Sequence, residues 1–267
     1  MKEWLRKQLS YSLHAPRAIK INRSQYISSK KDEMWQADLI DLSNLKKENN
    51  AKYLLTVIDI LSKYASVEKL FNKKPQSIVS AFKKIFKFRK PKILITDGGR
   101  EFDNKIFKTF LSNLNIKHYI ARNTEVKCAV VERFNRTIKE KIFKYLTEFN
   151  TKKFIDKLDI LVKNYNNTIN SRTKFTPSSI NRSNENIAFL NLYTKRKLYS
   201  NSHLKKGDTV RLLNIKSAMS KGYTPNWTKE TFKISKVLNT SPKRYKITDN
   251  KNNEIIGSFY SEELNKV

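Results

Sequence analysis

The chain is poor in cysteine and in long apolar runs. Its one cysteine among 267 residues, Cys128, excludes a disulfide within the chain and favours a reducing compartment. The first residues contain no apolar run of signal-peptide length, and nowhere do 18 apolar residues follow one another. We therefore expect no cleavable leader and no membrane span, and the sequence predicts a soluble, intracellular protein.

Acidic residues are also scarce. The chain has 24 Asp and Glu against 55 Lys and Arg, a formal net charge of +31. The basic residues are spread over the whole length among aromatic ones, and no single amphipathic helix concentrates them, which argues against a membrane-surface protein. A basic surface that only solvates the protein is the simpler alternative. Because 39% hydrophobic residues can fill a core, we expect a globular protein with nucleic acid as its partner.

The length predicts two domains. Residues 1–31 contain eight Lys and Arg and one acid, which favours a basic arm or a short helical lead-in. Alternating and helical patterns then follow, so that an antiparallel meander precedes an α/β alternation. The expected strands are 33–42, 52–60, 64–70, 92–96 and 116–121, and the expected helices are 75–88, 106–114, 128–149 and 152–168.

The last third of the chain has a different pattern. Residues 170–204 show no periodicity and are rich in Asn, Ser and Lys, so we place a linker at 183–204. Short strand patterns then occur at 209–213, 231–237, 244–248 and 254–259, separated by turn residues, as in a small β-barrel over residues 205–267.

Three acids occupy positions typical of metal-dependent phosphoryl transfer. Asp38 lies within a strand pattern between apolar neighbours, where an unpaired buried carboxylate is unfavourable. Asp97 follows an apolar strand and should emerge at its carboxyl end, and Glu132 lies on the long expected helix. Each has a plainer reading as a solvated or turn acid. Together, two strand-end carboxylates and a helical one outline a two-metal site acting on phosphate.

The motifs around these acids resemble those of a known family. They are Trp35-Gln36-Ala37-Asp38, Thr96-Asp97-Gly98-Gly99-Arg100-Glu101-Phe102 and Val130-Val131-Glu132-Arg133-Phe134-Asn135-Arg136-Thr137-Ile138-Lys139. They resemble the three acidic motifs of retroviral-type (DDE) integrases. The chain is most similar to the integrases of Maverick/Polinton transposons and virophages, and this resemblance covers roughly residues 33–267.

The resemblance implies an α/β, ribonuclease-H-like catalytic core over residues 32–182, with a mixed sheet flanked by helices. It implies that Asp38, Asp97 and Glu132 are catalytic and bind two Mg²⁺ or Mn²⁺ ions. The implied reactions are 3′-end processing of element DNA and strand transfer into target DNA.

Three further residues are candidate DNA contacts by the same resemblance: Asn135, Arg136 and Lys139. Arg136 and Lys139 lie four and seven positions after Glu132, so a helix puts them on one face, where ordinary surface charge is the alternative. Asn135 either touches DNA or positions the helix. Asp59 and Glu101 are nearby acids that we assign to structure.

The C-terminal segment resembles the chromodomain-like barrel of these integrases. Its aromatic residues could contact a histone tail through cation–π interactions or simply fill the barrel core; they are Tyr223, Trp227, Phe232 and Tyr260. From Lys195 onward there are 16 Lys and Arg against six acids, so DNA-backbone binding is the safer assignment. Upstream of the core the sequence has only His14 and no cysteine, so we expect no N-terminal zinc module.

These observations predict a DNA integrase, a polynucleotidyl transferase with endonuclease activity. We expect it to work as a homo-multimer on double-stranded element ends and target DNA, in the host nucleus or where element DNA is replicated. Two alternatives stay open. One is a nuclease that nicks DNA with the same site, and the other is a catalytically silent protein that binds DNA or tethers it to chromatin.

Overall fold

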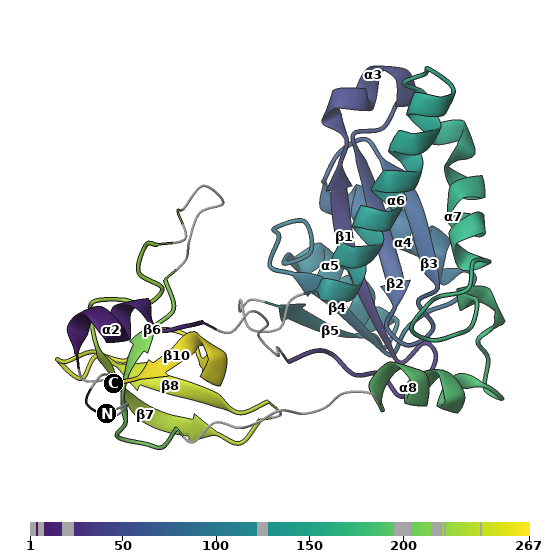
Figure 1. Cartoon of the computed structure of the whole chain (residues 1–267). Helices are drawn as coiled ribbons and strands as arrows, with labels where there is room; N and C mark the ends of the chain where they lie inside the picture. Colours follow the sequence, from purple (N-terminus) through teal and green to yellow (C-terminus); the bar gives the residue numbers. More distant parts are fainter. Residues whose placement is uncertain are drawn as a thin grey trace. The chain divides into compact units, whose positions relative to one another are not determined.

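The computed structural model describes residues 4, 8–17, 24–121, 128–194, 204–214, 221, 223–240 and 242–267. These residues form two compact units, each of which has its own sheet (Figure 1). The core unit contains residues 25–121 and 128–194. The terminal unit contains residues 8–17 and 24 and the described residues from 204 to 267.

The core unit is built on a five-stranded mixed sheet in the order β3-β2-β1-β4-β5. Its strands are β1 (Met34–Asp41), β2 (Tyr53–Asp59), β3 (Ala65–Leu70), β4 (Ile93–Asp97) and β5 (Lys117–Ala121). β1, β2 and β3 pair antiparallel, whereas β4 is parallel to both β1 and β5. The expected meander followed by α/β alternation is therefore confirmed.

Helices cover both faces of this sheet. The main ones are α4 (Pro75–Phe86), α5 (Lys105–Asn113), α6 (Ala129–Glu148) and α7 (Leu158–Asn166). Because successive strand residues point to opposite faces, Ala37 packs in the cluster with Phe82 and Phe107, whereas Ile40 packs with Phe134 of α6. Figure 1 shows α6 running over β1 and β2. Asp38 has the same parity as Ile40 and so lies on the α6 face.

Two parts of the core unit differ from expectation. The helix expected over 152–168 begins only at Leu158, after the 3₁₀ turn η2 (Ile155–Lys157). The preceding residues are held by the buried side chain of Asn49, whose Oδ1 accepts from the N–H groups of Phe154 (2.8 Å) and Ile155 (3.0 Å). A tertiary contact thus holds the residues that lead into η2 and α7. The short elements η1 (Ser43–Leu45) and α3 (Lys46–Asn49) precede β2.

The segment expected to be an irregular linker contains a helix, α8 (Glu185–Tyr193), after the turn η3 (Pro177–Ser179). Ala188 and Leu192 are buried, and Asn191 donates from Nδ2 to the carbonyl of Thr173 (2.9 Å). This packing explains why α8 forms although its sequence has no amphipathic helical pattern. Residues 195–203 of the expected linker lie outside the described residues.

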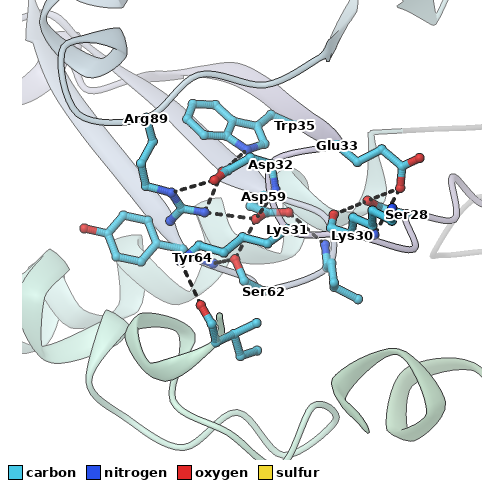
Figure 2. Close-up of polar contacts among 12 residues, drawn as sticks. Ser28, Lys30, Lys31, Asp32, Glu33, Trp35, Asp59, Ser62, Tyr64 and Arg89 are labelled. Atoms are coloured by element: carbon cyan, nitrogen blue, oxygen red, sulfur yellow. Dashed lines mark hydrogen bonds and ion pairs between the residues drawn. The ribbon is translucent and has the colours of Figure 1, made fainter. Parts of the chain in front are cut away.

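A cluster of charged side chains fixes the start of β1, as Figure 2 shows. The Arg89 guanidinium is 2.6 Å from Asp32 Oδ1 and 3.1 Å from Asp59 Oδ2, and it lies over the ring of Tyr64. Trp35 Nε1 donates to Asp32 Oδ1 (3.0 Å). The Asp59 side chain is only 1% exposed, which agrees with its assignment to structure. We call these residues the Arg89 cluster.

The terminal unit is an antiparallel sheet in the order β10-β6-β7-β8-β9. Its elements are β6 (Thr209–Leu212), β7 (Phe232–Leu238), β8 (Arg244–Thr248), β9 (Phe259–Tyr260), η4 (Ser261–Glu263) and β10 (Leu264–Lys266). The strand expected over 254–259 is wrong: Glu254 forms only an isolated bridge, and β9 begins at Phe259. Trp227, Phe232 and Tyr260 are buried, so of the four aromatic residues only Tyr223 is exposed.

The N-terminal segment contributes to the terminal unit. Helix α2 (Leu9–His14) has Leu13 buried, and the Leu13 carbonyl accepts from the N–H groups of Asn226 and Trp227. Trp227 Nε1 donates to the carbonyl of Ala15 (2.8 Å). Residues 9–15 are therefore docked on the terminal unit, and α2 agrees with the short helical lead-in, one of the two alternatives expected for residues 1–31. No described helix is both long and apolar enough to cross a membrane.

Candidate active site

Asp38 is the half-buried centre of the site. Its Oδ1 accepts from the N–H of Leu39 (2.7 Å), and its Oδ2 accepts from Nδ2 of Asn135 on α6 (2.7 Å). Burial raises the pKa of the Asp38 carboxyl, and the negative charges of Asp97, Glu132 and Glu101 raise it further. Asp38 thus lies among acids, in a setting where a cation would be stabilised.

Asp97 reaches the same end of the sheet through parallel pairing. Ala37 of β1 is opposite Thr96 of β4, so the next residue of each strand is an aspartate, Asp38 and Asp97. Asp97 is exposed at the end of β4, and its Oδ1 accepts from the N–H of Gly99 (3.2 Å). The expectation that this acid emerges at the carboxyl end of a strand is confirmed.

Glu132 comes from the first turn of α6 and is exposed. Just before it, the Cys128 thiol is buried, and its pKa is raised to about 12, first by burial and then by the charges of Asp97, Asp38 and Glu132. The structure therefore places the three predicted acids in one neighbourhood, where each affects the pKa of Asp38 or Cys128, although they are distant in sequence. Their catalytic role stays a prediction.

No positive side chain neutralises these acids: among the described residues, none of the three forms an ion pair. Among the described residues, no three His, Cys, Asp or Glu side chains are gathered closely enough to hold a metal ion. The carboxylate oxygens of Asp38, Asp97 and Glu132 nevertheless suit Mg²⁺, which binds carboxylate oxygens and usually only one or two carboxylates. The residues fit a divalent cation by chemistry, and binding requires the side chains to close on it.

A groove of about 550 Å³ leads away from the acids along α6. Its lining residues are Asp38, Glu132, Asn135, Arg136, Lys139, Glu140 and Phe143. Arg136 and Lys139 are exposed and pair with no acid among the described residues. Three carboxylates near Arg136 and Lys139, which lie one and two helical turns after Glu132, form a site able to bind a phosphate chain.

Residues 28–125 match the family described as integrase core domain. Over these residues the chain is similar to integrase core domains. The matched residues include Asp38 and Asp97 and end before Glu132. The mixed sheet and its flanking helices are the ribonuclease-H-like fold of integrase catalytic cores.

Two curated relatives support the same assignment. A transposon-derived protein of Caenorhabditis elegans is 31% identical over 194 residues, which are 72% of this chain and 65% of the relative. The retrovirus-related Pol polyprotein from transposon 412 of Drosophila melanogaster is 32% identical over 109 residues, 40% of this chain and 9% of the polyprotein. The chain thus spans less than two thirds of either relative.

A solved structure is similar over nearly the whole chain. A chain of the simian T-cell lymphotropic virus intasome, solved by cryo-EM in complex with PP2A regulatory subunit B56 gamma, has a TM-score of 0.68. The match covers 99% of this chain and 89% of that chain at 14% identity, which shows a shared fold.

Asn135, on α6, is used differently from a free DNA contact. It is 9% exposed, its Nδ2 donates to Asp38, and its Oδ1 accepts from the Thr56 hydroxyl at 2.7 Å. Both ends of its amide are therefore engaged within the protein. This arrangement fits the positioning role that the sequence left open, and contact with DNA stays a prediction.

One residue of the integrase core was missed by sequence reasoning. Gln36 is 1% exposed, and its Oε1 accepts from the N–H groups of Val130 (3.0 Å) and Val131 (3.1 Å) at the start of α6. The available signal was its position two residues before Asp38, which places both side chains on the α6 face.

Proposed function

We propose that this protein is a DNA integrase, which processes the 3′ ends of element DNA and joins them to target DNA. The observation that supports this most is the nearness of Asp38, Asp97 and Glu132, with no ion-paired cation among the described residues, in a chain whose residues 28–125 match the integrase core domain. The net charge of +31 suits a polyanionic substrate.

In this proposal the three carboxylates hold two Mg²⁺ or Mn²⁺ ions. Bound ions of this kind activate an attacking oxygen and stabilise the leaving oxygen at phosphorus. Asp38 gives the site a fixed point because Asn135 and the Leu39 N–H orient its carboxylate. Asp97 and Glu132 are exposed and free to move toward a ligand.

Arg136 and Lys139 are proposed to bind DNA phosphates along the α6 groove. They share a helical face with Glu132, and a phosphate chain held there passes the three acids. Asn135 is at most an indirect contributor in this proposal, since its amide already binds Asp38 and Thr56.

Several finer assignments belong to the same proposal. We infer that the protein is an integrase of the Maverick/Polinton and virophage group. We propose that it acts as a homo-multimer on double-stranded DNA, in the nucleus or where element DNA is replicated. The transposon-derived C. elegans relative supports a mobile-element origin. We also propose that residues 205–267 act as a chromodomain-like, DNA-binding module. Binding of a histone tail has less support because three of the four candidate aromatic residues are buried.

A strand-transfer assay tests the proposal. Purified protein is incubated with labelled duplex ends and supercoiled target in Mg²⁺ or in EDTA, and wild type is compared with Glu132→Gln. We expect metal-dependent joined product in wild type and none in Glu132→Gln. Glu140→Gln is the matched control, because Glu140 lines the same groove on the same helix.

The other outcomes are equally informative. Joined product from Glu132→Gln would contradict the assignment of the third carboxylate. Cleaved ends that are never joined would favour the nicking nuclease. Binding without cleavage, across several end sequences, would favour the tethering protein.

A further inference from the structure

Helix α6 begins without the side chain that normally caps such a helix. The first N–H groups of a helix lack partners within it, and an N-cap side chain usually accepts from the second or third of them. Here the N-cap residue is Cys128, and its side chain makes no capping hydrogen bond. The second and third helical residues, Val130 and Val131, instead donate to Gln36.

Gln36 therefore caps α6 from a different element of the fold. Its buried Oε1 lies 3.0 Å from Val130 N and 3.1 Å from Val131 N, across 94 and 95 positions of sequence. An N-cap residue moves with the helix that it caps, but Gln36 is fixed in β1, where it lies opposite Ile58 of β2 and Ile95 of β4. The start of α6 is thus tied to the centre of the sheet.

This contact between β1 and α6 matters because each of the two elements carries a carboxylate of the site just after it. Asp38 is two residues after Gln36, and Glu132 is the residue after Val131. The N–H of Glu132 donates to the Cys128 carbonyl (3.0 Å), which is the first hydrogen bond within the helix. A slip of α6 by one residue would rotate Glu132 by about 100°, and fraying of the first turn would remove it from the helix.

A second contact holds the same two elements one turn further along. Asn135 Nδ2 donates to Asp38 Oδ2 (2.7 Å). These two hydrogen-bonded contacts, at Gln36 and at Asp38, add directional restraints to the hydrophobic packing of α6 on the sheet.

We propose that Gln36 is a positioning residue of the active site: by capping α6 from β1, it sets the place of Glu132 relative to Asp38. Its importance for the reaction rests on the proposed function, whereas its effect on the helix does not. Gln36 touches no reacting atom, so its removal weakens cation binding and catalysis through Glu132.

The chain offers a matched control in Asn49. Asn49 is also buried, and its Oδ1 also accepts from two successive N–H groups, those of Phe154 and Ile155. These groups come after the other end of α6, away from the three carboxylates. Gln36→Met and Asn49→Leu each remove a buried amide that binds two backbone donors, but only Gln36→Met loosens the start of α6.

The first measurement is amide hydrogen exchange at Val130 and Val131 by NMR, without metal or DNA. We expect exchange about tenfold faster in Gln36→Met, as for the loss of a helix cap, and unchanged in Asn49→Leu. Gln36→Glu keeps the acceptor oxygen and should retain the protection. If Gln36→Met does not fold, Gln36→Asn, whose amide is one methylene shorter, tests the same contact. If Val130 and Val131 exchange in Gln36→Met at the same rate as in wild type, the capping role is overturned.

The second measurement is Mn²⁺ affinity of the DNA-free protein. We expect a roughly tenfold or greater loss in Gln36→Met and little change in Asn49→Leu, in line with the effect of residues that orient metal ligands. Equal Mn²⁺ affinity of Gln36→Met and wild type would overturn the positioning role. Wild-type protein that binds Mn²⁺ with the expected dependence on Gln36, but joins no DNA, would instead overturn only the proposed function.

Discussion

Two groups of acidic side chains lie on the sheet of the core unit, and they differ in what faces them. In the Arg89 cluster, Asp32 and Asp59 share one guanidinium. At the candidate site, Asp38 faces the like charges of Asp97, Glu132 and Glu101. Burial raises the pKa of both Asp59 and Asp38. The positive charge of Arg89 opposes this rise at Asp59, whereas the neighbouring acids add to it at Asp38.

The difference separates acids that stabilise the fold from acids that we propose to bind a cation. The Arg89 cluster joins the segment before β1, the end of β2 and the residues after α4, so its charges are satisfied within the protein (Figure 2). The carboxylates of the site have no such partner in the described part of the chain. We therefore expect the first cluster to govern stability and the second to govern activity.

The largest effect on stability is expected from Arg89→Met. Removing the guanidinium leaves Asp59 buried without its cation, which typically costs about 3–5 kcal/mol in the free energy of unfolding. Urea unfolding measures this change. Lys84→Met is the control, since the exposed Lys84–Glu68 pair is worth less than about 1 kcal/mol. Adding Asp59→Asn to Arg89→Met should restore part of the stability; no restoration would show that the buried charge is not the cause.

The converse change is Asp97→Asn. Because Asp97 is exposed and faces like charges, its neutralisation should change the free energy of unfolding by no more than about 0.5 kcal/mol. Strand transfer should fall by more than about 100-fold, beyond what the loss of a ligand-orienting residue costs. Asp156→Asn, which changes an exposed acid elsewhere, should retain activity. A stable Asp97→Asn protein with full activity would remove the distinction between the two clusters.

The pH dependence of stability sharpens the comparison within one strand. The pKa of Asp38 is raised above its usual 3.8, so the folded protein takes up its proton first and loses stability as the pH rises through that window. The pKa of Asp41 is lowered by its hydrogen bonds to Ser43, so its contribution is present above pH 3.8 and lost as the pH falls.

Unfolding by urea from pH 3 to 7, in the presence of a chelator, tests these signs. Relative to wild type, Asp38→Asn should gain stability as the pH rises, by about 1.4 kcal/mol for each unit of pKa shift. Asp41→Asn should change with pH in the opposite direction. If the stability differences of Asp38→Asn and Asp41→Asn from wild type change with pH in the same direction, the pKa shifts assigned to Asp38 and Asp41 are contradicted.

The smallest effect concerns the groove. Lys139→Met should weaken DNA binding severalfold and reduce the slope of log affinity against log salt by about 0.9, the value for one phosphate contact. Lys83→Met on α4, on the other face of the sheet, is the control. Fluorescence anisotropy over a salt series measures both. An unchanged slope for Lys139→Met would exclude a phosphate contact at this position.

Local patterns were sufficient for most of the core unit. The alternation of Trp35 and Ala37 with Ile40, and the helical spacing of Val131, Phe134 and Ile138, place these side chains in the two clusters where they are found. The pattern failed where a distant side chain decided the local structure. Asn49 binds the N–H groups of Phe154 and Ile155 just before α7, and β10 exists only because residues 264–266 pair with β6.

The amino-acid sequence by itself determined which acids are candidates and which helix carries Glu132, Arg136 and Lys139, and its charge predicts an anionic partner, because these depend on residue type and local spacing. Only the tertiary structure decided that Asp38 lies beside Asp97, that Arg89 neutralises Asp59, and that Gln36 caps α6. Parallel strand pairing, buried ion pairs and capping by another strand join residues far apart in the chain. No local spacing encodes these contacts, because they form only when the sheet and its helices pack.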